Sequence, residues 1–395
     1  MTQVFIIYET VEPCNIETVR LFSQLEARGK IKLNHKLAKD VDAYDLNQCD
    51  VLLSIRSTSL LELDLGTKAQ KMGKLWVLLL DDDFLNLGRN YGADGSGYWK
   101  GRKNTLIKIV EKIDCLIAVN DLLAQKYTEI GGIPRYVLLD TIVQKEELYE
   151  PRTKDGSDRI NIVLYTNDGT TGMFDAIIRP ILPKLAEAYP NRITLHFIAL
   201  HPDLKEIGQG ININYVSHMP YADFKRFMGE SRFDIGLSPL FDEGFSQYKY
   251  FNKYIEYSVA GIPAVYSDCR LYRLCIENGE NGVLCANTAE DWYRAIVSLI
   301  ENPERRIQMV NAAQNDLVAN HSVDGVLERL CEGIPELLRG IAPSTKRCQP
   351  SFIAYTHLRY AFFRMCGWGN TMWNFIRRGA VVPMFKRSIK RFVKK

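Results

Sequence analysis

Short apolar runs alternate with helix-length segments along most of this 395-residue chain. In the first 143 residues, amphipathic patterns predict helices over 16–27, 59–72 and 121–130. The apolar runs predict strands at Val4–Tyr8, Val51–Ile55, Leu75–Leu80, Cys115–Val119 and Tyr136–Leu139. Apolar strands that alternate with helices are typical of a parallel sheet covered on both faces.

A polar segment that contains Pro and Gly, Gln144–Arg159, interrupts this pattern and predicts a linker. The alternation then restarts. Further strands are predicted at Ile160–Tyr165, Ile193–Leu200, Ile213–Val216, Asp234–Leu237, Ala264–Tyr266 and Val283–Cys285. Helical patterns between them cover Met173–Tyr189, Tyr221–Gly229, Tyr248–Ala260, Ala289–Glu301 and Pro303–Ala319.

The whole pattern predicts an α/β fold of two doubly wound, Rossmann-like domains that face a cleft. The expected domains are 1–143 and 160–340, joined by the linker 144–159 and followed by a tail over 341–395. Ligands of such sheets bind beyond the carboxyl ends of the strands, so a cleft between the domains is a natural place for two substrates.

The segment Asn86–Asn104, NLGRNYGADGSGYWKGRKN, holds five glycines and has no apolar period. It is not a phosphate-binding P-loop, because no Gly-Lys-Ser/Thr follows. The segment predicts a long loop, which is either a mobile functional segment or a plain surface excursion.

Composition indicates a folded protein, with 46% apolar and 25% charged residues. Nine dispersed cysteines without a CxxC pair indicate reduced thiols in a cytoplasm. Residues 1–10 lack the basic start of a signal peptide, and no apolar run reaches the about 18 residues of a membrane span.

Charge is distributed very unevenly along the chain. Residues 346–395 hold twelve Lys or Arg and no Asp or Glu, whereas 1–345 has a net charge of −9. The tail interleaves these cations with aromatic residues, which suits an amphipathic segment on an anionic membrane surface. Packing of part of the tail on the first domain and nucleic-acid binding are the other uses; no nucleic-acid fold signature accompanies the tail, so we expect no nucleic-acid partner.

One charged stretch lies directly before a predicted buried strand. A helix is predicted to begin near Ser246, a good N-cap, and to carry Lys249, Lys253 and Glu256 on one face. Lysines at a helix start, with its backbone amides, suit a diphosphate, and a carboxylate further along suits ribose hydroxyls. The combination indicates a nucleotide sugar; the alternative is a solvated helix face.

The region 234–319 resembles the C-terminal half of a GT-B glycosyltransferase of the family 4 type. The matching pieces are Glu243-Gly244-Phe245, Glu256-Tyr257 before Ala260-Gly261-Ile262-Pro263, the strand 264–266, the run IENGENGVL at 276–284, and the helix pair AEDWYRAIVSLIENPERR from 289. The run VLLLDDDFLNL at 77–87 is also similar to one branch of this group.

The resemblance implies transfer of a sugar from a nucleotide donor held by the C-terminal domain, with retention, without a metal or other cofactor. Glu243 matches the first family glutamate and would lie near the donor sugar with Gly244 and Phe245. Glu256 matches the second and would bind the ribose. Twelve residues separate the two glutamates here, whereas the family usually has seven.

Family members commonly carry Arg and Lys after the first strand of this domain, but here the loop is Asn167-Asp168-Gly169-Thr170-Thr171-Gly172. We therefore expect the two lysines to hold the diphosphate, assisted by backbone amides near Gly169 and Thr170. His218 and Met219 lie where similar enzymes contact the nucleobase.

Three carboxylates, Asp81, Asp82 and Asp83, follow an apolar strand. They suit a metal site, a general base or acceptor-orienting group formed by Asp82 and Asp83, or a turn without chemistry. We expect the second, because the lysines already supply positive charge, and so expect no metal.

These observations predict a cytoplasmic glycosyltransferase, peripheral on the inner face of the cell membrane. The expected donor is a nucleotide sugar, and the expected acceptor is a lipid-linked saccharide of a surface polysaccharide. A nucleotide-sugar epimerase and a catalytically silent scaffold subunit are the alternatives.

Overall fold

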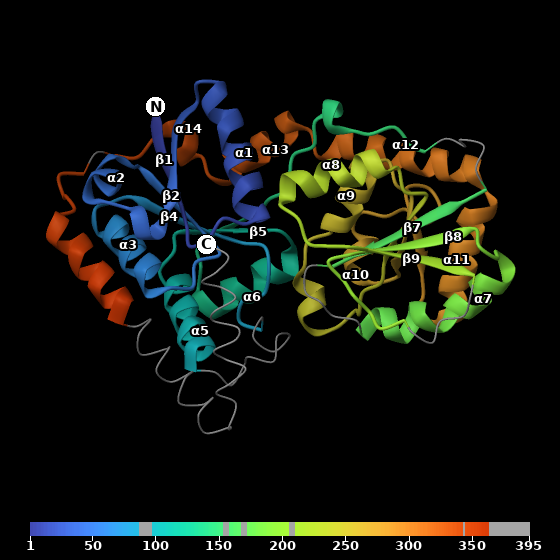
Figure 1. Ribbon diagram of the computed structural model, residues 1–395. Helices are drawn as coiled ribbons and strands as arrows, with labels where there is room; N and C mark the ends of the chain where they lie inside the picture. The colour runs from blue at the N-terminus through green and yellow to red at the C-terminus, as the bar shows by residue number, and fades with distance from the viewer. Residues whose placement is uncertain (87–96, 153–157, 167–171, 205–209, 343, 363–395) are drawn as a thin grey trace, which may run out of the picture. The chain divides into compact units, whose positions relative to one another are not determined.

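The computed structural model describes the chain except for residues 87–96, 153–157, 167–171, 205–209, 343 and 363–395. It divides into two compact units (Figure 1). Unit 1 comprises Met1–Asp140 and Leu327–Lys395, and unit 2 comprises Thr141–Val326. No helix in the described part of the chain is both long and apolar enough to cross a bilayer.

Unit 1 is built on a six-stranded parallel sheet in the order β2-β1-β3-β4-β5-β6. Its strands are β1 Thr2–Tyr8, β2 Ile31–Leu37, β3 Val51–Ile55, β4 Leu75–Leu80, β5 Cys115–Ala118 and β6 Tyr136–Leu138. Its helices are α1 Pro13–Ala27, α2 Ala43–Gln48, α3 Leu60–Lys71, α5 Gly97–Val110, α6 Asp121–Gly131 and α14 Glu336–Arg339, while α13, Val323–Gly333, crosses the boundary between the units.

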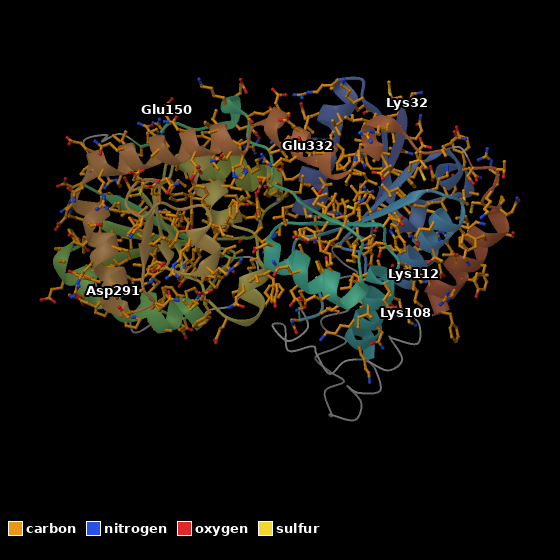
Figure 2. The ribbon with its side chains drawn as sticks, turned by 180° about the vertical axis from the view of Figure 1, so that it is seen from behind. Lys32, Lys108, Lys112, Glu150, Asp291 and Glu332 are labelled. Atoms are coloured by element: carbon orange, nitrogen blue, oxygen red, sulfur yellow. The ribbon has the colours of Figure 1, made fainter. Side chains whose placement is uncertain are left out.

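Two elements of unit 1 differ from the prediction. Strand β2, which was not predicted, lies at the sheet edge and carries the polar residues of IKLNHKL, so it lacks a continuous apolar run. Helix α5 occupies the end of the expected loop at 86–104. It buries Leu106, Ile109 and Val110 completely and exposes Lys108 (Figure 2). Two glycines, at 97 and 101, had masked the amphipathic pattern at its start.

Unit 2 contains a second six-stranded parallel sheet, in the order β12-β11-β10-β7-β8-β9. Its strands are β7 Ile160–Tyr165, β8 Ile193–Ile198, β9 Ile211–Val216, β10 Ile235–Ser238, β11 Ala264–Ser267 and β12 Val283–Cys285. Its helices are α7 Leu182–Ala188, α8 Tyr221–Ser231, α9 Asn252–Val259, α10 Arg270–Arg273, α11 Ala289–Glu301 and α12 Pro303–Asn320. Both sheets confirm the α/β architecture.

Part of the expected linker 144–159 packs on unit 2. The Tyr149 amide donates to the carbonyl of Val259 at 2.8 Å, and the Gln314 side chain donates to the Tyr149 carbonyl at 2.8 Å. A Cβ on Gly229 would lie 2.3 Å from the Tyr149 ring, so the glycine admits the ring. Because residues 144–159 are mostly polar, the sequence alone does not indicate that Tyr149 packs in this way.

The C-terminal part of the chain returns to unit 1 before residue 340, the expected end of the second domain. Arg135 forms an ion pair with Glu336 of α14 at 2.8 Å, and the Thr2 hydroxyl donates to the Glu336 carbonyl at 3.1 Å. A helix over 350–362, which we call the return helix, follows. Its Arg359 pairs with Asp64 of α3 at 2.7 Å.

Candidate active site

The strand order of unit 2 has a topological switch point between β7 and β10. Chain order rises from β7 through β8 to β9 on one side and from β10 to β12 on the other. In open parallel sheets ligands bind outside the carboxyl ends of the strands at such a point. The strands end there at Tyr165 and Ser238.

Two charged side chains of α9 lie at the carboxyl end of β7. Glu256 accepts a hydrogen bond from the Tyr165 hydroxyl, and Lys253 Nζ lies 5.0 Å from the centre of the Tyr165 ring. Burial, and then the Glu256 carboxylate, raise the pKa of Tyr165 well above its usual value, so the phenol keeps its proton and donates it. The structure thereby holds Lys253 and Glu256 beside the switch point.

Lys249 does not lie in the first turn of this helix, so that part of the prediction is wrong. Helix α9 begins at Asn252, after a 3₁₀ turn over Gly244–Tyr248. Lys249 has extended backbone angles, φ −73° and ψ 162°. Its Nζ lies 5.2 Å from the centre of the Phe245 ring.

The helix cannot extend back to Ser246 because two aromatic residues pack in the intervening segment. The rings of Tyr250 and Phe251 lie 4.3 Å apart, and Phe251 meets the His321 ring edge-on at 5.9 Å. The Tyr250 hydroxyl accepts a hydrogen bond from the Thr141 amide at 3.1 Å. These contacts require Phe251 to take φ −79° and ψ 41°, outside the helix.

Glu243 is exposed and directly precedes the 3₁₀ turn. Gly244 has φ +58°, a left-handed conformation that favours glycine, and a Cβ there would meet no atom within 4 Å. The left-handed backbone conformation, rather than a lack of room for a side chain, therefore explains why this position is a glycine. Phe245 is half-buried under the Lys249 cation.

The remaining predicted donor residues belong to other segments of the chain than α9 and the turn before it. His218 and Met219 follow β9 at the far edge of the sheet; His218 is exposed and Met219 half-buried. Gly169 and Thr170 lie outside the described residues.

The three aspartates that follow β4 in unit 1 have different environments. Asp81 forms an ion pair with Arg56, which also pairs with Glu12. Asp82 is half-buried. In the described part of the chain, no group of three or more His, Cys, Asp or Glu is placed to hold a metal ion.

Asp83 is completely buried and held by three partners. Lys126 Nζ lies 2.6 Å from Oδ2, the Asn86 amide donates to Oδ2 at 2.6 Å, and the Tyr127 hydroxyl donates to Oδ1 at 3.2 Å. A carboxylate so enclosed favours a structural role, which leaves Asp82 as the better candidate for acceptor chemistry.

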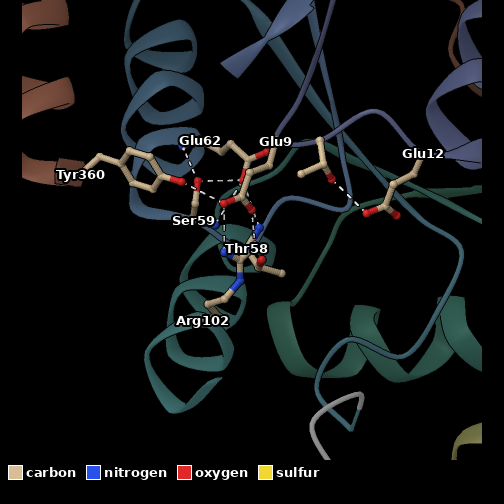
Figure 3. Close-up of polar contacts among 8 residues, drawn as sticks. Glu9, Glu12, Thr58, Ser59, Glu62, Arg102 and Tyr360 are labelled. Carbon is tan, nitrogen blue, oxygen red and sulfur yellow. Dashed lines mark hydrogen bonds and ion pairs between the residues drawn. The ribbon is translucent and has the colours of Figure 1, made fainter. Parts of the chain in front are cut away.

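Sequence reasoning missed a polar cluster at the switch point of unit 1, between β1 and β3 (Figure 3). Glu9 follows β1 and forms an ion pair with Arg102 of α5, and it accepts a hydrogen bond from the Tyr360 hydroxyl at 2.9 Å. Glu62, in the first turn of α3, lies beside Glu9 in Figure 3. The signal for Glu62 is the pattern Ser59-x-x-Glu62 of a capping box.

Glu62 is completely buried, and within the part of the chain that the structure describes one of its two carboxyl oxygens accepts hydrogen bonds. Oε2 accepts hydrogen bonds from the Ser59 hydroxyl at 2.9 Å, the Ser59 amide at 3.1 Å and the Thr58 amide at 3.2 Å. Among the described residues, Oε1 has no hydrogen-bond partner. Burial, and then the charge of Glu9, raise the pKa of Glu62 to about 7.

Comparison with known proteins agrees with this architecture. The family model described as glycosyl transferase-like matches residues 179–332. No curated protein matches the chain in sequence.

Many solved structures are similar in fold, among them the following three, each at low sequence identity. Anabaena Alr3699/HepE, in complex with UDP and glucose, is 11% identical with a TM-score of 0.59, covering 85% of this chain and all of its own. Sucrose-phosphate synthase (tll1590) from Thermosynechococcus elongatus is 12% identical with a TM-score of 0.58, covering 86% and 100%. The lipopolysaccharide outer core galactosyltransferase WaaB is 13% identical with a TM-score of 0.51, covering 85% and 99%. The chain therefore has the GT-B fold, and the match to the glycosyl transferase-like family model lies in unit 2 and extends into α13.

Proposed function

We propose that this protein transfers a sugar from a nucleotide-sugar donor to a hydroxyl group of a saccharide acceptor. The observation that carries the proposal is the placement of Lys253 and Glu256 at the carboxyl end of β7, inside a unit that matches the glycosyl transferase-like family. The similar HepE structures contain UDP-glucose, or UDP and glucose, which supports a nucleotide sugar as the donor.

In this proposal the ammonium group of Lys253 lies against the diphosphate, and Lys249 contributes from the neighbouring extended segment. Glu256 accepts hydrogen bonds from ribose hydroxyls, since a carboxylate can accept several hydrogen bonds. Glu243, with Gly244 and Phe245, lies near the donor sugar.

The chemical step exchanges one bond for another. The bond between the anomeric carbon and the diphosphate oxygen breaks, the acceptor oxygen bonds to that carbon, and the acceptor's proton leaves with the diphosphate or to Asp82. We propose retention of anomeric configuration and no metal ion, because lysines stabilise the leaving diphosphate. Activity that is lost in EDTA and restored by Mn²⁺ would contradict the proposal that no metal ion is needed.

We further propose that the acceptor is lipid-linked and that the protein is peripheral on the inner face of the cell membrane. The outer face of the return helix supports this, because Tyr355, Leu358 and Phe362 are exposed by 61%, 72% and 65%. The basic composition of residues 363–395 suits anionic headgroups. The similarity to WaaB in fold is compatible with a surface polysaccharide as product.

Liposome flotation tests the membrane proposal. Leu358→Ser should reduce binding to vesicles that contain phosphatidylglycerol. Leu274→Ser, at an exposed leucine of unit 2, is the matched control. Equal flotation of wild type and both variants would contradict a role for the return helix.

A thermal-shift screen against UDP-, GDP- and dTDP-sugars tests the main proposal, because a ligand that binds the native state raises the melting temperature. One nucleotide class should stabilise the protein, and Lys253→Ala should abolish the shift. Lys108→Ala, at an exposed lysine of α5, is the control. Hydrolysis of the donor without acceptor distinguishes an enzyme from a silent binding subunit.

A further inference from the structure

The polar cluster of unit 1 has one buried atom whose hydrogen-bonding capacity is not used within the described residues, and two further such atoms lie on the segments around it. Glu62 Oε1, the Ser57 hydroxyl and the Thr356 hydroxyl are completely buried and have no hydrogen-bond partner. Buried polar atoms nearly always have one, so unused groups of this kind indicate a missing water or ligand. One of the three, Glu62 Oε1, belongs to the cluster itself.

The return helix covers this cluster. Its inner face carries Thr356 and, one turn later, Tyr360, whose hydroxyl donates to Glu9. Lys68 Nζ of α3 lies 5.5 Å from the centre of the Phe352 ring on the same helix. Tyr360 thus makes with Glu9 the kind of hydrogen bond that an alcohol would make.

The charges of the cluster select among ligands. Arg102 is the cation at this point, and Glu9 is its ion-pair partner, while Glu62 adds a second carboxyl. The Arg102 charge is matched by Glu9, so an ionised Glu62 would repel an anionic ligand. Both oxygens of Glu9 accept from Arg102, and Glu9 Oε1 also accepts from Tyr360, whereas Glu62 Oε1 can accept a hydrogen bond from a hydroxyl group.

We propose that Glu9 and Glu62 form the site that binds hydroxyl groups of an uncharged sugar of the acceptor, and that the Tyr360 hydroxyl occupies this site when the acceptor is absent. This inference rests on the proposed glycosyltransferase function. It assigns acceptor recognition to the switch point of unit 1 and makes Glu62 a positioning residue rather than a catalytic one.

Saturation-transfer NMR with three probes tests the proposal: methyl glucoside, methyl glucuronoside and methyl glucosaminide. The neutral glucoside should bind the wild-type protein best. Tyr360→Phe should tighten its binding roughly 2- to 10-fold, because the competing hydrogen bond is lost. Glu62→Gln should weaken binding roughly 10-fold, because a charged acceptor is lost.

Glu332→Gln, at an exposed glutamate of α13, is the matched control and should leave binding unchanged. In wild type, binding should strengthen from pH 6 to pH 8 as Glu62 ionises in the presence of Glu9, Arg102 and Tyr360. In Glu62→Gln this strengthening should be lost.

Three results would overturn the site: no binding of the glucoside to wild type and to Tyr360→Phe, equal binding by wild type and Glu62→Gln, or tighter binding of either charged probe. A separate measurement tests the proposal that Lys253 binds the nucleotide-sugar donor. Lys253→Ala should lose the nucleotide-induced thermal shift while it keeps glucoside binding.

Discussion

The cations of the two candidate sites are held by different contacts. In unit 1 each of three cations pairs with carboxylates: Arg56 with Glu12 and Asp81, Arg102 with Glu9, and Lys126 with Asp83. In unit 2, Lys253 and Lys249 lie over the aromatic rings of Tyr165 and Phe245.

This difference indicates which kind of ligand could bind at the carboxyl end of each sheet. Ion pairs neutralise the cations of unit 1 and leave carboxyl oxygens in excess, which favours hydroxyl groups. An aromatic ring face orients a lysine side chain, and a diphosphate is attracted by the charge of such a lysine. The following predictions test this division, from the largest expected effect to the smallest.

Asp83→Ala should lower the free energy of unfolding by about 3 kcal/mol, because it leaves the Lys126 charge and the Tyr127 hydroxyl without their buried partner. Urea denaturation measures the loss. Asp82→Ala is the control, with a change within about 0.5 kcal/mol but with slower transfer to acceptor. Equal stability of both variants would mean that Asp83 is not the structural carboxylate.

Stability should depend on pH through Glu62. The folded protein keeps this proton up to about pH 7, whereas an unperturbed glutamate releases it near pH 4.5. The free energy of unfolding should therefore fall as pH rises from 4.5 to above 7, by about 3 kcal/mol in total. Glu62→Gln should lose this component of the pH dependence and Glu332→Gln should keep it, as measured by urea unfolding at pH 5 and pH 8.

Lys253→Ala should weaken binding of the nucleotide sugar by about 2 kcal/mol, or roughly 30-fold, because a charge-assisted contact to the diphosphate is lost. Isothermal titration calorimetry measures this change, with Lys108→Ala as the control. An unchanged dissociation constant would show that the cation beside Tyr165 does not hold the donor.

Lys249→Ala should have a smaller effect, about 1 kcal/mol or less, because the side chain projects from an extended segment outside α9. The same titration checks it. A loss larger than that of Lys253→Ala would reverse the ranking of the two lysines.

Much of the fold could be predicted because buried parallel strands are continuous apolar runs. The bounds of β3, β4, β7 and β12 agree with the prediction. Strand β2 was missed because its edge position admits polar residues, and α9 was predicted to begin too early because the packing of Phe251 is a tertiary effect.

The candidate site was less accessible to sequence reasoning. Glu256 could be identified because it lies in a local motif before a Gly-Ile-Pro turn. Its partner Tyr165 lies 91 residues away, and Glu9 and Tyr360 are separated by 351 residues. Pairs at such distances become neighbours only through the fold.

The return helix also has a consequence for the order in which the protein folds during synthesis. Unit 2 is one continuous segment and is complete once residue 326 has emerged. Synthesis of unit 1 begins first but is completed last, because Glu9 and Asp64 can contact Tyr360 and Arg359 only after the return helix has been made. During synthesis, therefore, all residues of unit 2 emerge before the last residues of unit 1. In a nascent chain arrested before residue 350, α3 and Glu62 should be accessible to proteases.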